Sequence, residues 1–190
     1  MKDMATVTEK INKLCADRKM SEEELAEGAG LTVEQVKRIC RSDLIPSLAS
    51  LIKIARALGV RLGTFLDDSE EVGPVVHRHS PAKEEVTFTS HQTSPNAHMD
   101  FVSLAGRKAG RNMEPFLVHI QSGSGKESFS SHEGEEFLYV LEGSITVRYG
   151  REEYILQQGD SIYYDSIVDH LVTATGATEA KILGVIYTPA

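Results

Sequence analysis

The 190-residue sequence has no long apolar run and only two cysteines, Cys15 and Cys40. No stretch approaches the roughly eighteen apolar residues of a membrane-spanning helix, so no membrane partner is expected. The first twenty residues include Lys2, Lys10 and Lys13 and lack the apolar core of a secretory signal, which predicts a cytoplasmic protein. Two cysteines without a C-x-x-C motif do not make a disulfide framework, and both are expected to be buried on helices.

Positive charge is scarce after residue 66. Residues 1–66 hold 11 Lys or Arg against 9 Asp or Glu, a net charge of +2. Residues 67–190 hold 9 against 19, a net of −10, and the two segments sum to −8. Because nucleic-acid binding needs local positive charge, only the first segment is a candidate for contact with DNA. The acidic second segment would repel phosphate and is expected to face away from it.

Residues 1–66 show the start and stop signals of a helical bundle. Ser21 and Glu24 have the spacing of a capping box, as do Thr32 and Gln35, so each pair predicts the start of a short helix. Two short helices joined by a glycine-containing turn predict a helix-turn-helix. The five expected helices are about 8–17, 21–28, 33–40, 47–58 and 61–66.

This region resembles the repressor-type helix-turn-helix family. The family pattern L-x-x-x-R-x-x-S-x-x-x-L-A-x-x-A-G-L runs from Leu14 to Leu31, and Pro46-Ser47-Leu48 follows. The resemblance implies that residues 33–40 lie in the major groove of double-stranded DNA. It also implies a homodimer or higher homo-oligomer, because one such domain covers only half of a two-fold operator. The candidate DNA contacts are Thr32, Glu34, Gln35, Lys37 and Arg38; the alternative is an ordinary solvated face.

The remainder of the chain reads as a linker followed by many short strands. Asp67 to Pro74 is acidic and ends in Gly-Pro, and residues 67–80 are assigned to the linker. Residues 81–190 alternate apolar and polar positions between glycine-led turns, which is typical of an antiparallel sandwich or barrel. The expected strands are 86–89, 99–104, 116–120, 136–141, 145–148, 153–156, 161–164, 170–173 and 181–187.

One stretch of the second domain, F-S-S-H-E-G-E-E-F-L-Y-V-L-E-G from Phe129 to Gly143, carries candidate metal ligands. His132 and Glu136 are four residues apart in a run that favours a strand, so both are expected on the same face. His170 follows another glycine-led turn into a strand. Two imidazoles and one carboxylate can therefore converge.

These segments resemble the two motifs of the cupin family, G-x5-H-x-H-x3/4-E-x6-G and G-x5-P-x-G-x2-H-x3-N. The matching positions are His132, Glu136, Gly143, Gly159 and His170. The departing positions are Ser130, in place of the first histidine, and Asp165, Ile167 and Ala174. The resemblance implies an α+β two-domain protein, with an all-α five-helix repressor-like bundle at residues 1–66 and an all-β antiparallel jelly-roll (cupin) barrel at 81–190.

The same resemblance implies a three-ligand metal site made of His132, Glu136 and His170. Two histidines and one carboxylate leave coordination positions open and favour iron(II), with zinc, nickel and manganese as alternatives. A cupin pocket that holds no metal is the other alternative. The candidate pocket residues are Ser130, Tyr139, Tyr163 and Tyr164. Because strand side chains alternate, Tyr163 and Tyr164 cannot both point inward.

Joining a DNA-reading domain to a barrel resembles the one-component bacterial regulators. This predicts a DNA-binding transcriptional regulator whose cupin barrel senses an unidentified small-molecule effector, either through a bound metal or without one. A further alternative is a regulator whose effector is the metal itself.

The layout also resembles the iron-dependent epoxidases that act on hydroxypropyl phosphonate, which likewise lack the first cupin histidine. That resemblance implies a non-haem iron(II) oxygenase or epoxidase with a small anionic, phosphonate-like substrate. The helical domain of those enzymes supplies a lysine, matched here by Lys19, whereas their substrate-side tyrosine is matched by Phe101. The sequence leaves open whether the protein is an enzyme or a regulator.

Overall fold

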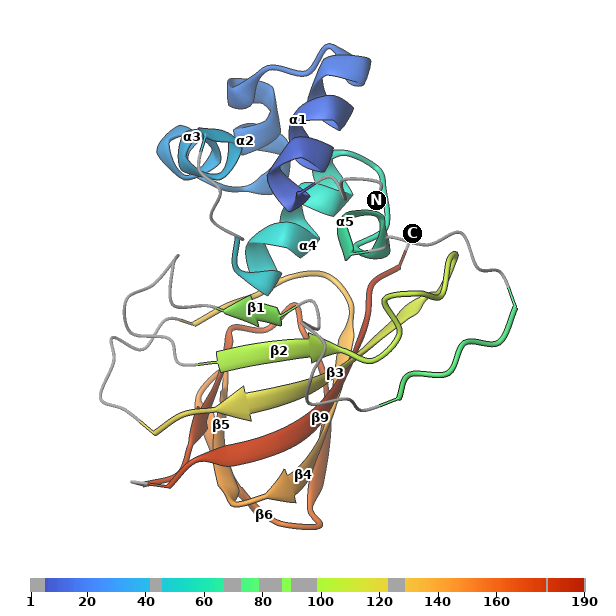
Figure 1. Cartoon of the computed structure of the whole chain (residues 1–190). Helices are drawn as coiled ribbons and strands as arrows, with labels where there is room; N and C mark the ends of the chain where they lie inside the picture. The colour runs from blue at the N-terminus through green and yellow to red at the C-terminus, as the bar shows by residue number, and fades with distance from the viewer. Residues whose placement is uncertain are drawn as a thin grey trace.

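The computed structural model describes residues 6–41, 46–66, 73–78, 87–89, 99–122, 129–176 and 178–189. A cluster of helices forms the N-terminal part and antiparallel β-sheets form the C-terminal part, with α4 and α5 next to the sheets (Figure 1). The predicted linker at 67–80 falls partly outside the described residues. Within the described ranges, no helix is both long and apolar enough to span a membrane.

All five expected helices are present. They are α1 (Val7–Arg18), α2 (Glu22–Ala29), α3 (Val33–Arg41), α4 (Leu48–Ala57) and α5 (Gly63–Leu66). Both predicted capping boxes form, since the Ser21 hydroxyl accepts from the Glu24 amide and the Thr32 hydroxyl accepts from the Gln35 amide. In each box the glutamate or glutamine side chain accepts the amide hydrogen of the capping residue in return.

The second helix was predicted to end at Gly28, but it continues for one more residue, to Ala29. Gly28 lies inside α2, and a β-carbon added there would be 3.3 Å from the Ala57 side chain of α4. The missing side chain therefore lets α2 and α4 pack closely. Gly30 caps the helix after Ala29 with a φ of 60°, which glycine readily adopts.

The helical part has its own apolar core. Its fully buried members include Leu25 on α2, Val36 on α3, Leu51 and Ile54 on α4, and Phe65 on α5. The two cysteines were expected to be buried, but both are only half-buried, Cys15 on α1 and Cys40 on α3, and both are free thiols. They lie at the margin of the core rather than inside it.

The β part contains two antiparallel sheets. The six-stranded sheet has the order β1 (Thr87–Thr89), β2 (Met99–Ser103), β3 (Met113–Ile120), β9 (Ala180–Tyr187), β4 (Glu135–Glu142), β7 (Ser161–Asp165). The three-stranded sheet has the order β6 (Glu152–Gln157), β5 (Ser144–Tyr149), β8 (His170–Ala174). This supports the predicted antiparallel cupin fold, although among the described residues the hydrogen-bonded ladders do not join into one closed barrel.

Alternation along the strands separates an inner from an outer face. On β4 the side chains of Glu136, Leu138 and Val140 are buried, whereas those between them are not. The inner positions of β3, β5 and β9 are also buried, so the core lies between the two sheets. Glu136 is thus one of two buried acidic residues on a mainly apolar inner face, the other being Glu114 of β3, which pairs with Arg111.

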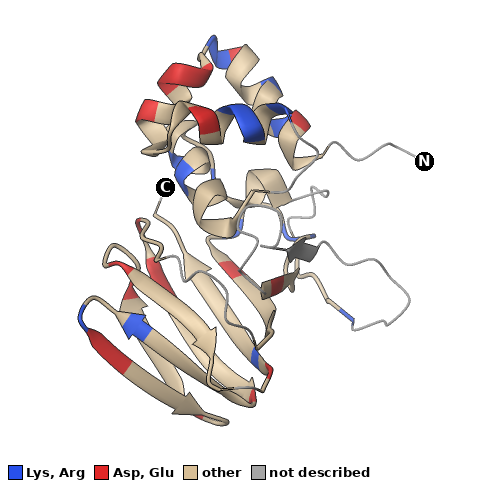
Figure 2. Ribbon diagram, turned by 90° about the vertical axis from the view of Figure 1, so that its left-hand side faces the viewer, with Lys and Arg blue, Asp and Glu red and all other residues tan. Residues whose placement is uncertain are grey.

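Among the described residues, the helical and β parts approach one another at several places, among them an ion pair and a close backbone approach. The Arg56 guanidinium of α4 pairs with the carboxylate of Glu133, at 2.8 Å between Nη1 and Oε1. The turn after β2 passes close to α5, since a β-carbon added at Gly106 would lie 3.8 Å from the Leu66 carbonyl oxygen. Figure 2 shows lysine, arginine and acidic residues along the helices above the sheets.

Candidate metal centre

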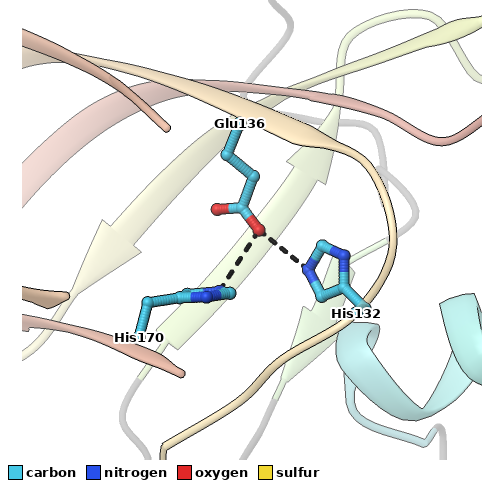
Figure 3. A group of neighbouring side chains, drawn as sticks. All are labelled: His132, Glu136 and His170. Carbon is cyan, nitrogen blue, oxygen red and sulfur yellow. Dashed lines mark ion pairs between the residues drawn. The ribbon is translucent and has the colours of Figure 1, made fainter. Parts of the chain in front are cut away.

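The structure brings His132, Glu136 and His170 together (Figure 3). All three side chains are buried, and one ligand atom from each lies within 4.8 Å of the other two. Glu136 comes from β4 in the six-stranded sheet and His170 from the first residue of β8 in the three-stranded sheet. The group therefore joins the two sheets at one end of the core.

His132 reaches this group in a way that differs from the prediction. It was expected to share a strand with Glu136, but β4 begins only at Glu135, so His132 precedes the strand. The chain turns at Gly134, with φ of 116°, and the His132 amide donates to the Ser166 carbonyl at 2.9 Å. A pair of 2.9 Å backbone hydrogen bonds between Ser130 and His170 holds the same segment. Tertiary pairing, rather than strand periodicity, places this imidazole.

The Glu136 carboxylate lies at the centre of the group. Its Oε1 is 2.8 Å from His132 Nε2 and 3.4 Å from His170 Nε2. The Tyr164 hydroxyl donates to Oε2 at 2.7 Å, and the Ser166 hydroxyl donates to Oε1 at 3.2 Å. Sequence reasoning missed Ser166, because a serine in a turn carries no signal until the fold shows what it faces.

The other nitrogen of each imidazole faces a backbone carbonyl. His132 Nδ1 is 3.1 Å from the Glu133 oxygen, and His170 Nδ1 is 2.8 Å from the Val168 oxygen. A carbonyl only accepts, so each hydrogen bond requires the proton on Nδ1. When the rings are neutral, both Nε2 lone pairs then point toward a carboxylate oxygen, which is repulsive unless a cation lies between them. The donor set therefore fits a divalent metal, with outer hydrogen bonds that orient the ligands.

The same contacts shift the pKa values of the buried groups. Burial raises the pKa of Glu136, but hydrogen bonds and charge from His132 and His170 outweigh it and hold that pKa well below its ordinary value. Burial lowers the pKa of His170, yet the adjacent Glu136 reverses this and raises it. Burial, together with the Glu136 charge, raises the pKa of Tyr164. The site thus contains a buried anion and a neutral phenol that donates to it.

The predicted pocket residues separate into two groups. Ser130 lies at the site, with its Oγ 3.2 Å from His170 Nε2, and Tyr164 is buried beside it. Tyr139 and Tyr163 occupy outward positions of β4 and β7, and Tyr163 is 62% exposed. Because side chains alternate along a strand, these two do not line the same space as Glu136. The expectation that only one of Tyr163 and Tyr164 points inward agrees with this placement.

The candidate DNA contacts all lie on or just before α3. Val36 and Ile39 are buried against the helical core, which leaves Glu34 and Arg38 on the exposed side. Thr32 and Gln35 hydrogen-bond each other in the capping box. Lys37 Nζ lies 3.9 Å from the Glu23 carboxylate.

Among the described residues, the two positions singled out by the enzyme resemblance form no hydrogen bond, ion pair or ring contact with the triad. Lys19 is the C-cap of α1 and has a φ of 54°, a left-handed conformation that is uncommon for a lysine. Phe101 lies on β2 and packs edge-to-face on Phe116, with ring centroids 6.0 Å apart. Neither side chain belongs to the group around Glu136.

A cleft of about 740 Å³ lies between the helices and the β part, and His132 forms part of its wall. Figure 3 shows a pale cyan helix of the N-terminal part beside His132. The basic residues of the lining are Lys53, Arg56 and Arg61. No sequence motif marks these residues, since only the packing of the two parts brings them near the triad.

Two family models match the chain, one for each part. Residues 10–71 match the Cro/C1-type HTH DNA-binding domain, and residues 116–186 match the cupin domain. The HTH-type transcriptional regulator SutR of Escherichia coli (strain K12) is 24% identical over 180 residues, which cover 94% of this chain and 93% of that protein. These matches span both the helical and the β parts.

Solved structures give the same arrangement. An HTH_3 family transcriptional regulator from Vibrio cholerae has a TM-score of 0.68 at 21% identity, covering 97% of this chain and 96% of that one, which shows a shared fold. The (S)-2-hydroxypropylphosphonic acid epoxidase of Streptomyces wedmorensis is 32% identical over 89 residues, 43% of this chain and 45% of the enzyme. A solved structure of that epoxidase has a TM-score of 0.51 at 25% identity, covering 95% of this chain and 96% of that one. The chain thus carries a Cro/C1-type helix-turn-helix DNA-binding domain followed by a cupin domain.

Proposed function

We propose that this protein is a cytoplasmic DNA-binding transcriptional regulator whose cupin domain senses a small molecule at a site that includes a divalent metal. The observation that carries the proposal is the placement of α3. Its apolar side packs on the helical core, its polar side stays exposed, and it lies farther from the sheets than α4 and α5 do (Figure 1). A recognition helix needs this combination of a fixed inner face and a free outer face.

The distribution of charge supports one orientation on DNA. Residues 1–66 have a net charge of +2 and residues 67–190 a net charge of −10. A duplex would attract the helical domain and repel the cupin domain, so α3 approaches the major groove with the sheets turned away. Two chains would bind half-sites about one helical turn apart, because one domain reads only a half-site.

The cupin domain would hold the metal through His132, Glu136 and His170. A two-histidine, one-carboxylate set suits iron(II), with zinc, nickel and manganese as the other candidates. A divalent ion there supplies a Lewis acid that can bind an oxygen or nitrogen atom of an effector. The protein's own part is to keep both Nε2 atoms and Oε1 turned inward, through the carbonyl, tyrosine and serine contacts described above.

Selection of bound duplexes from a random double-stranded DNA library tests the regulator. The wild-type protein is expected to enrich a pseudo-palindromic sequence, with affinity that falls steeply as salt rises. An Arg38→Ala variant should bind the enriched sequence about tenfold or more weakly, since a base or phosphate contact on the recognition helix is lost. Arg151→Ala, in the exposed turn between β5 and β6, is the matched control. Equal affinities for the two variants, or no enriched sequence, would count against the proposal.

A second candidate function is an iron-dependent oxygenase. The likeness to the epoxidase, 32% identity over 89 residues, favours it, together with the buried two-histidine, one-glutamate group. Lys19 and Phe101 do not add support to it, because among the described residues neither forms a hydrogen bond, ion pair or ring contact with the triad. Oxygen uptake by the iron-loaded protein on addition of (S)-2-hydroxypropylphosphonate, abolished in Glu136→Gln, would establish the enzyme instead of the regulator.

A further inference from the structure

We propose that the cleft between the helical domain and the cupin domain binds a small molecule with an oxyanion group, held by Lys53 and Arg61. The proposal deepens the function proposed above, on which its regulatory consequence rests, by naming where the effector binds and its chemical class. The two cationic residues, Lys53 and Arg61, lie outside both cupin motifs and outside the recognition helix.

The cleft has the size and the walls of a ligand site. Its volume of about 740 Å³ falls within the range of roughly 300–1,000 Å³ that small-molecule pockets occupy. One wall is the end of α2, from Glu27 to Gly30, and α4 with the turn that follows it. The opposite wall is the segment from Ser131 to Glu133, with Ile167 and Thr188. A ligand here contacts both domains at once.

The charge of the lining favours an anion. Arg56 is already neutralised by Glu133, at 2.8 Å. Of the other charged lining residues, Lys53 and Arg61 are cationic and Glu27 is acidic, which leaves a net charge of two minus one, or +1. Among the described residues, neither Lys53 nor Arg61 forms an ion pair.

The chemistry of these side chains points to an oxyanion rather than to a halide or a neutral molecule. A guanidinium donates two parallel hydrogen bonds that match a carboxylate or a phosphate, and an ammonium adds a point charge. Hydroxyl side chains in the same lining, those of Thr64, Ser131 and Thr188, offer further donors. Carboxylate and phosphate groups share this recognition chemistry.

The position of the cleft gives its occupant influence over the DNA-binding domain. The lining includes Gly30, which ends α2 and begins the turn into α3, and His132, a candidate metal ligand. A ligand that spans the cleft therefore contacts the helix-turn-helix and the metal segment together. It changes DNA affinity to the extent that it binds one arrangement of the two domains better than another.

Titration of the full-length protein with inorganic phosphate and with acetate, at constant ionic strength and without DNA, tests the proposal. Saturable heat of binding is expected for at least one of the two anions, and the comparison tells a phosphate site from a carboxylate site. A Lys53→Gln, Arg61→Gln double variant should bind that anion about tenfold or more weakly, as expected for lost charge-assisted hydrogen bonds. Lys13→Gln with Arg151→Gln changes the net charge equally at exposed positions outside the cleft and should bind like the wild type.

Two outcomes would overturn the proposal: no saturable binding of either anion, or an equal loss of affinity in the two double variants. An Arg61→Lys variant keeps the charge but loses the paired guanidinium donors, so its affinity should lie between those of the wild type and of the Lys53→Gln, Arg61→Gln variant. Urea unfolding of the double variant tells lost binding from a folding defect. The outcome for the proposed function is separate. If the variants change anion binding as expected but the anion leaves DNA affinity unchanged, the anion site is supported and regulation through it is excluded. If the protein binds DNA but neither anion, the proposed DNA-binding function is supported and the anion site is excluded.

Discussion

Arg56 of the helical domain and Glu133 of the cupin domain form an ion pair of 2.8 Å directly beside a candidate metal ligand. Glu133 follows His132 in the chain, and its carbonyl oxygen accepts from the His132 imidazole. The same residue therefore touches the helical domain through its side chain and the metal group through its backbone. A shift of His132 on metal or ligand binding would move the adjacent Glu133 and with it the ion pair to α4.

We expect this ion pair to contribute little to stability, because its side chains are 62% and 48% exposed. A double-mutant cycle of Arg56→Gln and Glu133→Gln, measured by urea unfolding, should give a coupling energy below about 1 kcal/mol that declines with added salt. The Arg148–Glu153 pair, 3.1 Å long and within the cupin domain, is the matched control and should give a similar value. A coupling above about 2 kcal/mol would mean that the interface is far more rigid than its exposure implies.

Metal content should depend on Glu136 and not on its neighbour. The Glu136→Gln variant removes the charge on which both imidazoles converge, so retention of iron(II), zinc, nickel or manganese after anaerobic dialysis should fall at least about tenfold. Glu135→Gln changes the adjacent, outward-facing side chain, whose carboxylate accepts a hydrogen bond from Tyr163 of β7. This variant should retain metal like the wild type. Elemental analysis of the dialysed proteins gives the answer. Equal metal in the two variants would exclude the triad as the binding site.

Two adjacent tyrosines should respond differently to loss of the hydroxyl. Tyr164→Phe removes the donor to the buried Glu136 Oε2, a bond of 2.7 Å, and should lower the free energy of unfolding by about 1–3 kcal/mol. Tyr163→Phe removes a donor from an exposed position and should change it by less than about 0.5 kcal/mol. Thermal or urea unfolding of the two variants provides the comparison, and equal losses would contradict the assigned inner and outer faces.

The Cys40 thiol should be unreactive at neutral pH. Burial, with smaller contributions from the Cys15 and Glu22 charges, raises its pKa from an ordinary value of 9.0 to about 11. Because the thiolate is the nucleophile, alkylation by iodoacetamide at pH 8 should be about a hundredfold slower than for a free thiol. Its stabilising contribution is complete below pH 9 and is lost as the pH rises through about 11. Rate measurements on a Cys15→Ser variant isolate Cys40, and a rate rising to a plateau near pH 9 would refute the shift.

The parts of the fold that depend on short-range chemistry were predictable from the sequence. The capping boxes at Ser21 and Thr32 form because a hydroxyl and a carboxylate or amide three residues later satisfy the same amides wherever they occur. The three members of the metal group were identifiable because the cupin spacing carries them.

Features that depend on distant packing were not predictable. The φ of Gly134 and the pairing of Ser130 with His170 place His132 outside β4. Neither feature can be predicted from a single sequence. The outward direction of Tyr139 depends on strand register. The cleft depends on how α4 packs beside a segment more than seventy residues away, so Arg61 gave no signal at all.

The turn that carries His132 packs tightly against the end of β9. A β-carbon at Gly134 would lie only 2.1 Å from the carbonyl oxygen of Tyr187, the last residue of β9. Strand β9 therefore packs against the turn that carries His132 and restricts its position. Proteolytic trimming, or a bulky affinity tag that pulls this strand out of register, would release that turn and weaken the metal site, although none of its three ligands would have been changed.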